Sequence, residues 1–107
     1  MNAPSRSRAE FLQAAFDDVV GPELADARAN TQYQVSYQPA VSVDGVVRLS
    51  LRVLNPRNWS VLSADIESTP DAFTIRSANH TSHVPDALLA QGLAVIKHGI
   101  VALRPNA

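Results

Sequence analysis

The chain has 107 residues, of which 46% are hydrophobic and only 18% charged, so it is long enough for one domain with its own apolar core. Nine basic residues face ten acidic ones and no segment is strongly basic, which argues against sequence-independent binding to nucleic acid. The absence of cysteine excludes disulfides, thiolate catalysis and cysteine-ligated zinc.

The N-terminal third predicts helices. Residues 1–6 are polar and predict a frayed tail. Ser7 and Glu10 have the spacing of a capping box, in which each side chain binds a free amide at the start of a helix. An amphipathic helix is then predicted by the helical spacing of Phe11, Leu12, Ala15, Phe16, Val19 and Val20. Because proline favours a first helical turn, Pro22 predicts a second short helix over 23–29, or else one kinked helix.

The middle of the chain predicts strands. Apolar and polar residues alternate over residues 31–38, which is typical of a half-buried strand that Pro39 either ends or places at the edge of a sheet. A hairpin follows, with strands at 40–43 and 46–54. Its turn is Asp44-Gly45, a pair that tolerates the positive φ angles of a type I′ turn.

Two further strands are predicted over residues 59–67 and 72–76, and a polar loop over 77–84. In the longer of these strands the residues expected to face inward are Leu62, Ala64 and Ile66.

The C-terminal segment has two interpretations. A helix over residues 86–97, with Gly99 as its C-cap, would be followed by a buried strand at 100–103. Alternatively, residues 93–96 pair with 100–103 in a hairpin. Nearly every position is apolar, so periodicity does not separate the two.

These elements predict a single α+β domain over residues 7–107. It would have an N-terminal amphipathic helix, an antiparallel sheet of four to five strands, a C-terminal helix and a final strand. A small β-sandwich or barrel with an N-terminal helical arm is the alternative.

Few residues suggest chemistry. His80 and His83 form an H-x-x-H pair that could chelate a metal from a loop. A third ligand would come from His98, Asp86 or Asp71. Asp65 and Glu67 share one strand face, which is more often solvated than catalytic, and Ser82 beside His83 lacks the features of a nucleophile. No cofactor or metal is therefore expected.

Aromatic and apolar side chains give a stronger indication of protein binding. Tyrosine, tryptophan and phenylalanine bury a large area at little entropic cost and are enriched in interfaces. The residues predicted to bind a partner are Phe11, Phe16, Val20, Tyr33, Tyr37 and Trp59. All six are also natural core residues.

By elimination, the sequence predicts a non-enzymatic protein–protein interaction or assembly protein. A homo-oligomeric head or tail accessory component of a bacteriophage virion is one example that fits the small size, the low charge and the absence of cysteine. Lys97 is the only lysine among nine basic residues, which is typical of a GC-rich bacterial or phage genome. The alternatives are a small regulatory or inhibitor protein that docks on another complex, and a metal-dependent enzyme using His80 and His83. We expect a cytoplasmic or virion location, no signal peptide and no membrane or nucleic-acid partner.

Overall fold

The computed structural model describes residues 7–30, 33–77 and 80–103, so the predicted tail at 1–6 lies outside the described residues. In chain order the elements are α1 (Arg8–Val19), α2 (Gly21–Asn30), β1 (Gln34–Val43), β2 (Val46–Leu54), β3 (Ser60–Ser68), β4 (Ala72–Ser77), β5 (His80–Pro85), a 3₁₀ turn η1 (Asp86–Leu88) and α3 (Leu89–Ala102).

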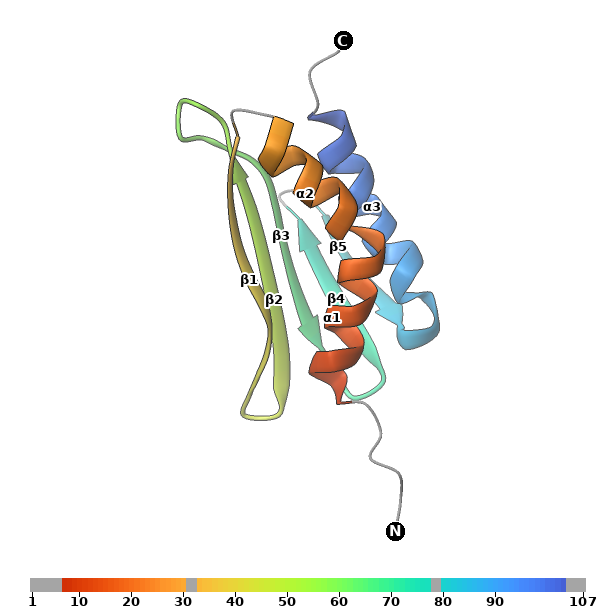
Figure 1. The fold of residues 1–107 in the computed structure, drawn as a ribbon. Helices are drawn as coiled ribbons and strands as arrows, with labels where there is room; N and C mark the ends of the chain where they lie inside the picture. Colours follow the sequence, from red (N-terminus) through yellow and green to blue (C-terminus); the bar gives the residue numbers. More distant parts are fainter. Residues whose placement is uncertain (1–6, 31–32, 78–79, 104–107) are drawn as a thin grey trace.

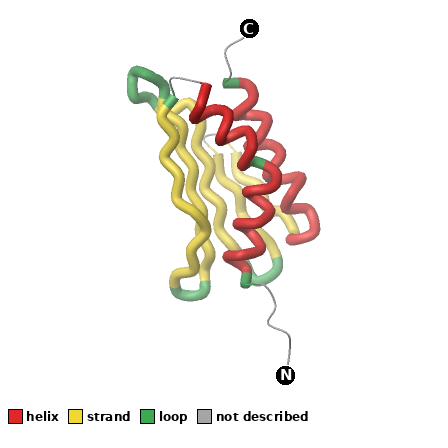
Figure 2. The backbone as a smooth tube through the Cα atoms, in the orientation of Figure 1, coloured by secondary structure: helices red, strands yellow, loops and turns green. Residues whose placement is uncertain are grey.

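The strands form one antiparallel sheet in the order β1-β2-β3-β4-β5. The helices lie together on one face of this sheet, with α1 and α2 as a bent rod and α3 alongside, while the other face is open (Figures 1 and 2). This arrangement confirms the predicted α+β fold. In the part of the chain that the structure describes, the sheet is single and open, so the sandwich or barrel alternative is wrong.

The capping box and the hairpin form as predicted. The Ser7 hydroxyl accepts a hydrogen bond from the Glu10 amide at 3.1 Å, and the Ser7 amide donates to the Glu10 carboxylate at 3.2 Å. Asp44 and Gly45 have φ angles of 54° and 78°, the positive values that a type I′ turn requires. Both features depend only on residues close in sequence.

Pro39 does not end a strand but lies within β1, an edge strand, so the edge position predicted for it is confirmed. The segments predicted at 31–38 and 40–43 contribute to one strand, β1, with an irregularity in its pairing between Gln38 and Val41. The side chain of Gln13 stabilises this bulge, because its oxygen accepts from the Ala40 amide at 2.8 Å. Its nitrogen donates to the Tyr37 hydroxyl at 2.6 Å, which joins α1 to β1.

The prediction of a polar loop at 77–84 is wrong over most of its length. Residues 80–85 form β5, which pairs with β4 from Ser77 opposite His80 to Ala72 opposite Pro85. The segment is polar because β5 is an edge strand and several of its side chains face water. Backbone pairing, which does not depend on side-chain polarity, makes it a strand.

The predicted final strand at 100–103 and the Gly99 C-cap are also wrong, as is the alternative hairpin. Helix α3 continues through Gly99 to Ala102. Its buried residues recur at spacings of four, three and four positions, which is the helical period: they are Leu89, Leu93, Ile96 and Ile100.

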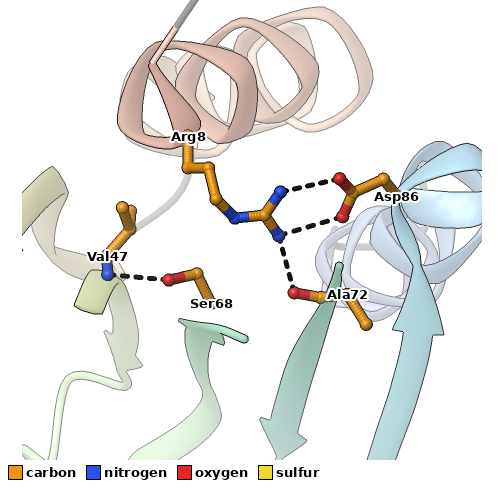
Figure 3. A network of polar contacts seen from close by, with 5 residues as sticks. All are labelled: Arg8, Val47, Ser68, Ala72 and Asp86. Atoms are coloured by element: carbon orange, nitrogen blue, oxygen red, sulfur yellow. Dashed lines mark hydrogen bonds and ion pairs between the residues drawn. The ribbon is translucent and has the colours of Figure 1, made fainter. Parts of the chain in front are cut away.

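A polar cluster links the start of α1 to η1, the turn that precedes α3 (Figure 3). The Arg8 guanidinium donates to both oxygens of Asp86, at 2.6 and 2.9 Å, and to the Ala72 carbonyl at 2.8 Å. It also lies 4.4 Å from the centre of the Phe73 ring. Hydrogen bonding from Arg8 lowers the pKa of Asp86. Because Asp86 begins η1, this contact fixes where α3 starts relative to α1.

Candidate functional site

An apolar groove of about 530 Å³ lies between α3 and the helix-facing side of β3, β4 and β5. We call it the α3–β5 groove. Its apolar lining comes from Leu62, Ile75, Val84, Leu88, Val95 and Ile96. The polar lining residues include His80, Ser82 and Gln91, and none of the described lining residues is an aspartate, glutamate, lysine or arginine.

The groove exists because two helical rods do not cover five strands. Strands about 4.8 Å apart place the outer axes of a five-stranded sheet about 19 Å apart. Two packed helices have axes only about 9 Å apart. On the β1 side, Val35 and Tyr37 pack against the core that α1 covers. On the β5 side, Ser82 and Val84 are only partly covered and form the floor of the groove.

Glycines shape the wall that α3 contributes. A Cβ atom at Gly92 would lie 2.9 Å from Ile75 Cδ1 and 3.1 Å from a Val84 methyl, and one at Gly99 would lie 2.8 Å from Leu62 Cδ1. The helix therefore approaches the sheet closely at these two positions. A larger residue at either position would meet side chains of the sheet.

The groove leaves large apolar side chains in water. Val95 of α3 is 66% exposed, and Leu88, the last residue of η1 directly before α3, is 43% exposed. Leu88, Gly92, Val95 and Gly99 recur at the same four-three-four spacing as the core residues, one position earlier. Helix α3 thus has two neighbouring apolar stripes, and this chain covers only one of them.

Strand β5 forms the free edge next to the groove. It pairs regularly with β4 along all six residues and contains no charged side chain apart from its histidines. The opposite edge, β1, carries Pro39 and the bulge that interrupts its pairing. Bulges and prolines protect sheet edges from pairing with other chains. By that criterion β5 is the less protected edge.

The open face of the sheet is polar and internally paired. Arg48 donates to Glu67 at 3.0 Å, and the Ser50 hydroxyl donates to Asp65 at 2.8 Å. Asp65 and Glu67, the two carboxylates that share a strand face, therefore each bind a different residue of β2. Thr74 lies 3.0 Å from His83 Nδ1 on the same face. The Arg48 and Ser50 contacts are those of a solvated sheet surface, whereas Thr74 itself is buried.

The structure does not bring His80 and His83 together. His80 lines the α3–β5 groove, whereas His83 contacts Thr74 on the open face. Residues three apart in a strand face opposite sides of the sheet, so the two rings do not bind one ion. In the described part of the chain, three or more potential metal ligands do not gather anywhere.

The residues predicted to bind a partner are divided between the core and the surface. Phe16 and Val20 are buried, and Phe16 stacks on the half-buried Tyr37 at 5.3 Å. Phe11 stacks on Phe73, and Tyr33 is half-buried. Trp59 is 66% exposed in the loop before β3.

The Trp59 loop is held by its own turn, because the Asn55 side-chain oxygen accepts from the amides of Arg57 and Trp59. A partner-binding role for Trp59 stays a prediction.

Sequence reasoning did not identify Leu88 and Val95. One signal was present. The segment 88–103 contains no acidic residue, has only Lys97 and His98 as basic residues, and is more apolar than one buried helix face requires. Such an excess indicates a helix with a second apolar contact.

Comparisons of the chain with protein-family models, curated proteins and solved structures give no match. Among the described residues, no helix has the length and apolar character needed to cross a membrane.

Proposed function

We propose that this protein is a non-enzymatic assembly protein, and that a second copy of the same chain covers the α3–β5 groove. The observation that carries the proposal is the uncharged apolar groove next to an uncharged, regular edge strand. Exposed apolar surface of this kind is typical of a contact that another molecule buries. A structural component of a larger particle, as the sequence predicts, is a natural setting for such a protein.

The charge distribution supports a second copy as the occupant. A two-fold interface places a surface patch against itself, so any formal charge near the axis meets a like charge. The described groove-lining residues and β5 carry none except histidines. Elsewhere the surface is charged, with Asp17 and Asp18 on α1 and Arg48 and Arg52 on the open sheet face. The groove is therefore a surface on which two copies meet without repulsion.

The shape of the surface also suits self-association. Val95 lies on α3 at the α3–β5 groove and is largely exposed. In a two-fold arrangement the Val95 side chain of each copy would face the groove of the other, so both apolar surfaces leave water in one contact. The favourable free energy comes from burying these side chains.

Light scattering coupled to size-exclusion chromatography tests the proposal. We expect the unmodified chain to form a dimer, and Val95→Lys to remain a monomer because it would place a charge in the contact. Val101→Lys is the matched control. It changes an exposed valine of the same helix, 40% exposed, that does not line the groove, and should still dimerise.

Circular dichroism and thermal melting should show the same fold for both variants, since both positions are exposed. A monomeric wild type, or a Val95→Lys variant that dimerises as well as the wild type, would contradict the proposal.

A further inference from the structure

We infer that the two copies join by adding β5 to β5 in antiparallel orientation, with Ser82 on the two-fold axis, to give one continuous ten-stranded sheet. This inference rests on the proposed function, because it specifies how the second copy covers the α3–β5 groove. It uses the free backbone groups of the edge strand as well as the apolar surface.

The edge strand supplies the hydrogen bonds. On an edge strand, alternate residues direct their amide and carbonyl groups away from the sheet, and another strand can pair with them. Two identical strands pair antiparallel about a two-fold axis, which gives a closed dimer. β5 suits this pairing because it is regular and uncharged, whereas β1 has Pro39 and its bulge.

The faces of β5 restrict the register. Ser82 and Val84 face the groove, and His83 faces the open side with its partner Thr74. Residues that lie opposite one another in a sheet share a face, and a slip by one residue reverses every side chain. A two-fold register must therefore be centred on a residue and not between two residues.

Pro85 determines which residue of β5 lies on the two-fold axis. With Ser82 on the axis, pairing covers residues 80–84, all of which have an amide hydrogen. With His83 on the axis, Pro85 enters the pairing, and proline has no amide hydrogen to donate. The register centred on Ser82 avoids this loss of a hydrogen bond.

With Ser82 on the axis, the pairing of the two β5 strands also brings the two α3–β5 grooves together. His80 of one copy would lie opposite Val84 of the other on the helix-facing side, so the two grooves meet across the axis. Helix α3 of each copy would flank the same merged groove, with Val95 and Leu88 as its covering side chains. Strand addition and burial of the groove therefore occur in one contact.

Disulfide trapping tests the register, and a chain without cysteine makes the result unambiguous. Residues opposite one another in antiparallel strands have Cβ atoms about 4.5–5.5 Å apart. A small movement allows a disulfide, whose Cβ atoms are about 3.8 Å apart. Ser82→Cys should therefore form a reductant-sensitive dimer under mild oxidation. Thr81→Cys, His83→Cys and the β1 control Ser36→Cys should stay largely monomeric on a denaturing gel.

Hydrogen–deuterium exchange on the unmodified protein provides a second test that needs no variant. Amides of β5 should exchange more slowly as protein concentration rises, while those of β1 should not change.

The outcomes separate the two proposals. A wild-type dimer in which Ser82→Cys is not preferentially trapped, or in which β5 amides gain no protection, overturns strand addition but leaves self-association through the groove intact. Preferential trapping of His83→Cys overturns the register. A monomeric wild type overturns both the inference and the proposed function.

Discussion

Replacing Arg8 by alanine should destabilise the fold more than a typical surface substitution. Arg8 is the first residue of α1, where a positive charge opposes the helix dipole. Its position is explained by tertiary contacts, namely two hydrogen bonds to Asp86, one to the Ala72 carbonyl and the Phe73 ring beneath it. The alanine variant loses all of these at once.

The size of the expected stability loss depends on how far the Arg8–Asp86 pair is buried. The side chains of Arg8 and Asp86 are 29% and 38% exposed, so the pair lies between a surface ion pair and a buried one. We assign about 1 to 1.5 kcal/mol to the pair, between the surface and buried cases. The cation–π contact contributes about 0.5 to 1 kcal/mol. When the hydrogen bond to the Ala72 carbonyl is included, Arg8→Ala should lower the free energy of unfolding by about 2 to 3 kcal/mol. This corresponds to a fall in Tm of about 10 °C.

Chemical denaturation of the wild type, Arg8→Ala, Asp86→Ala and the double variant gives the coupling energy, which we expect to be about 1 kcal/mol. Arg8→Lys is the control that keeps the charge but not the two-pronged hydrogen bonding, and should fall between wild type and Arg8→Ala.

The same pair gives a pH dependence. Arg8 lowers the pKa of Asp86 in the folded state, so the unfolded chain binds the proton more readily. The stabilisation is therefore complete above about pH 4, the ordinary carboxyl range, and is lost as pH falls through the lowered pKa. The stabilities of wild type and Asp86→Ala should converge in acid. A coupling energy near zero at neutral pH, or a Tm for Arg8→Ala equal to that of the wild type, would refute this reasoning.

Three further substitutions test the packing. Gly99→Ala should keep or raise the Tm, because alanine favours a helix by about 1 kcal/mol and the leucine it meets borders the open groove. Gly92→Ala should lower the Tm, because its Cβ meets two methyls of Val84, and equal effects of the two changes in thermal melts would contradict this account. Gln13→Ala should lower the free energy of unfolding by about 1 to 2 kcal/mol in urea titrations, because the Ala40 amide at the β1 bulge loses its acceptor; an unchanged midpoint would show that water replaces it.

Local chemistry made parts of the fold predictable. The capping box at Ser7 and the turn at Asp44-Gly45 each depend on residues within a few positions of one another. The alternation in β2 reflects one buried and one wet face, which is a local period of two. The α+β class follows from the order of these elements.

The errors arose where distant residues decide the structure. Strand β5 is specified by pairing with β4, and its polar composition masked it. Gly99 has the chemistry of a C-cap, yet in the structure it lies where α3 closely approaches Leu62. Pro39 is accommodated within β1 because Gln13, from another element, binds the adjacent amide.

The candidate site was harder to predict than the fold. The groove is formed by one flank of α3 and by side chains of three strands. These residues are far apart in the sequence, so they do not form a short motif. Aromatic residues identified as interface candidates include Phe16, which is buried. The H-x-x-H spacing suggested a metal-binding pair, but His80 and His83 face opposite sides of β5 and do not bind one ion together.

The solution mass of the unmodified protein over a dilution series tests the central claim most directly. A covered α3–β5 groove predicts a mass that approaches twice 11.5 kDa as concentration rises and does not increase beyond the dimer. A mass that stays at 11.5 kDa at every concentration would contradict the claim that a second copy covers the groove.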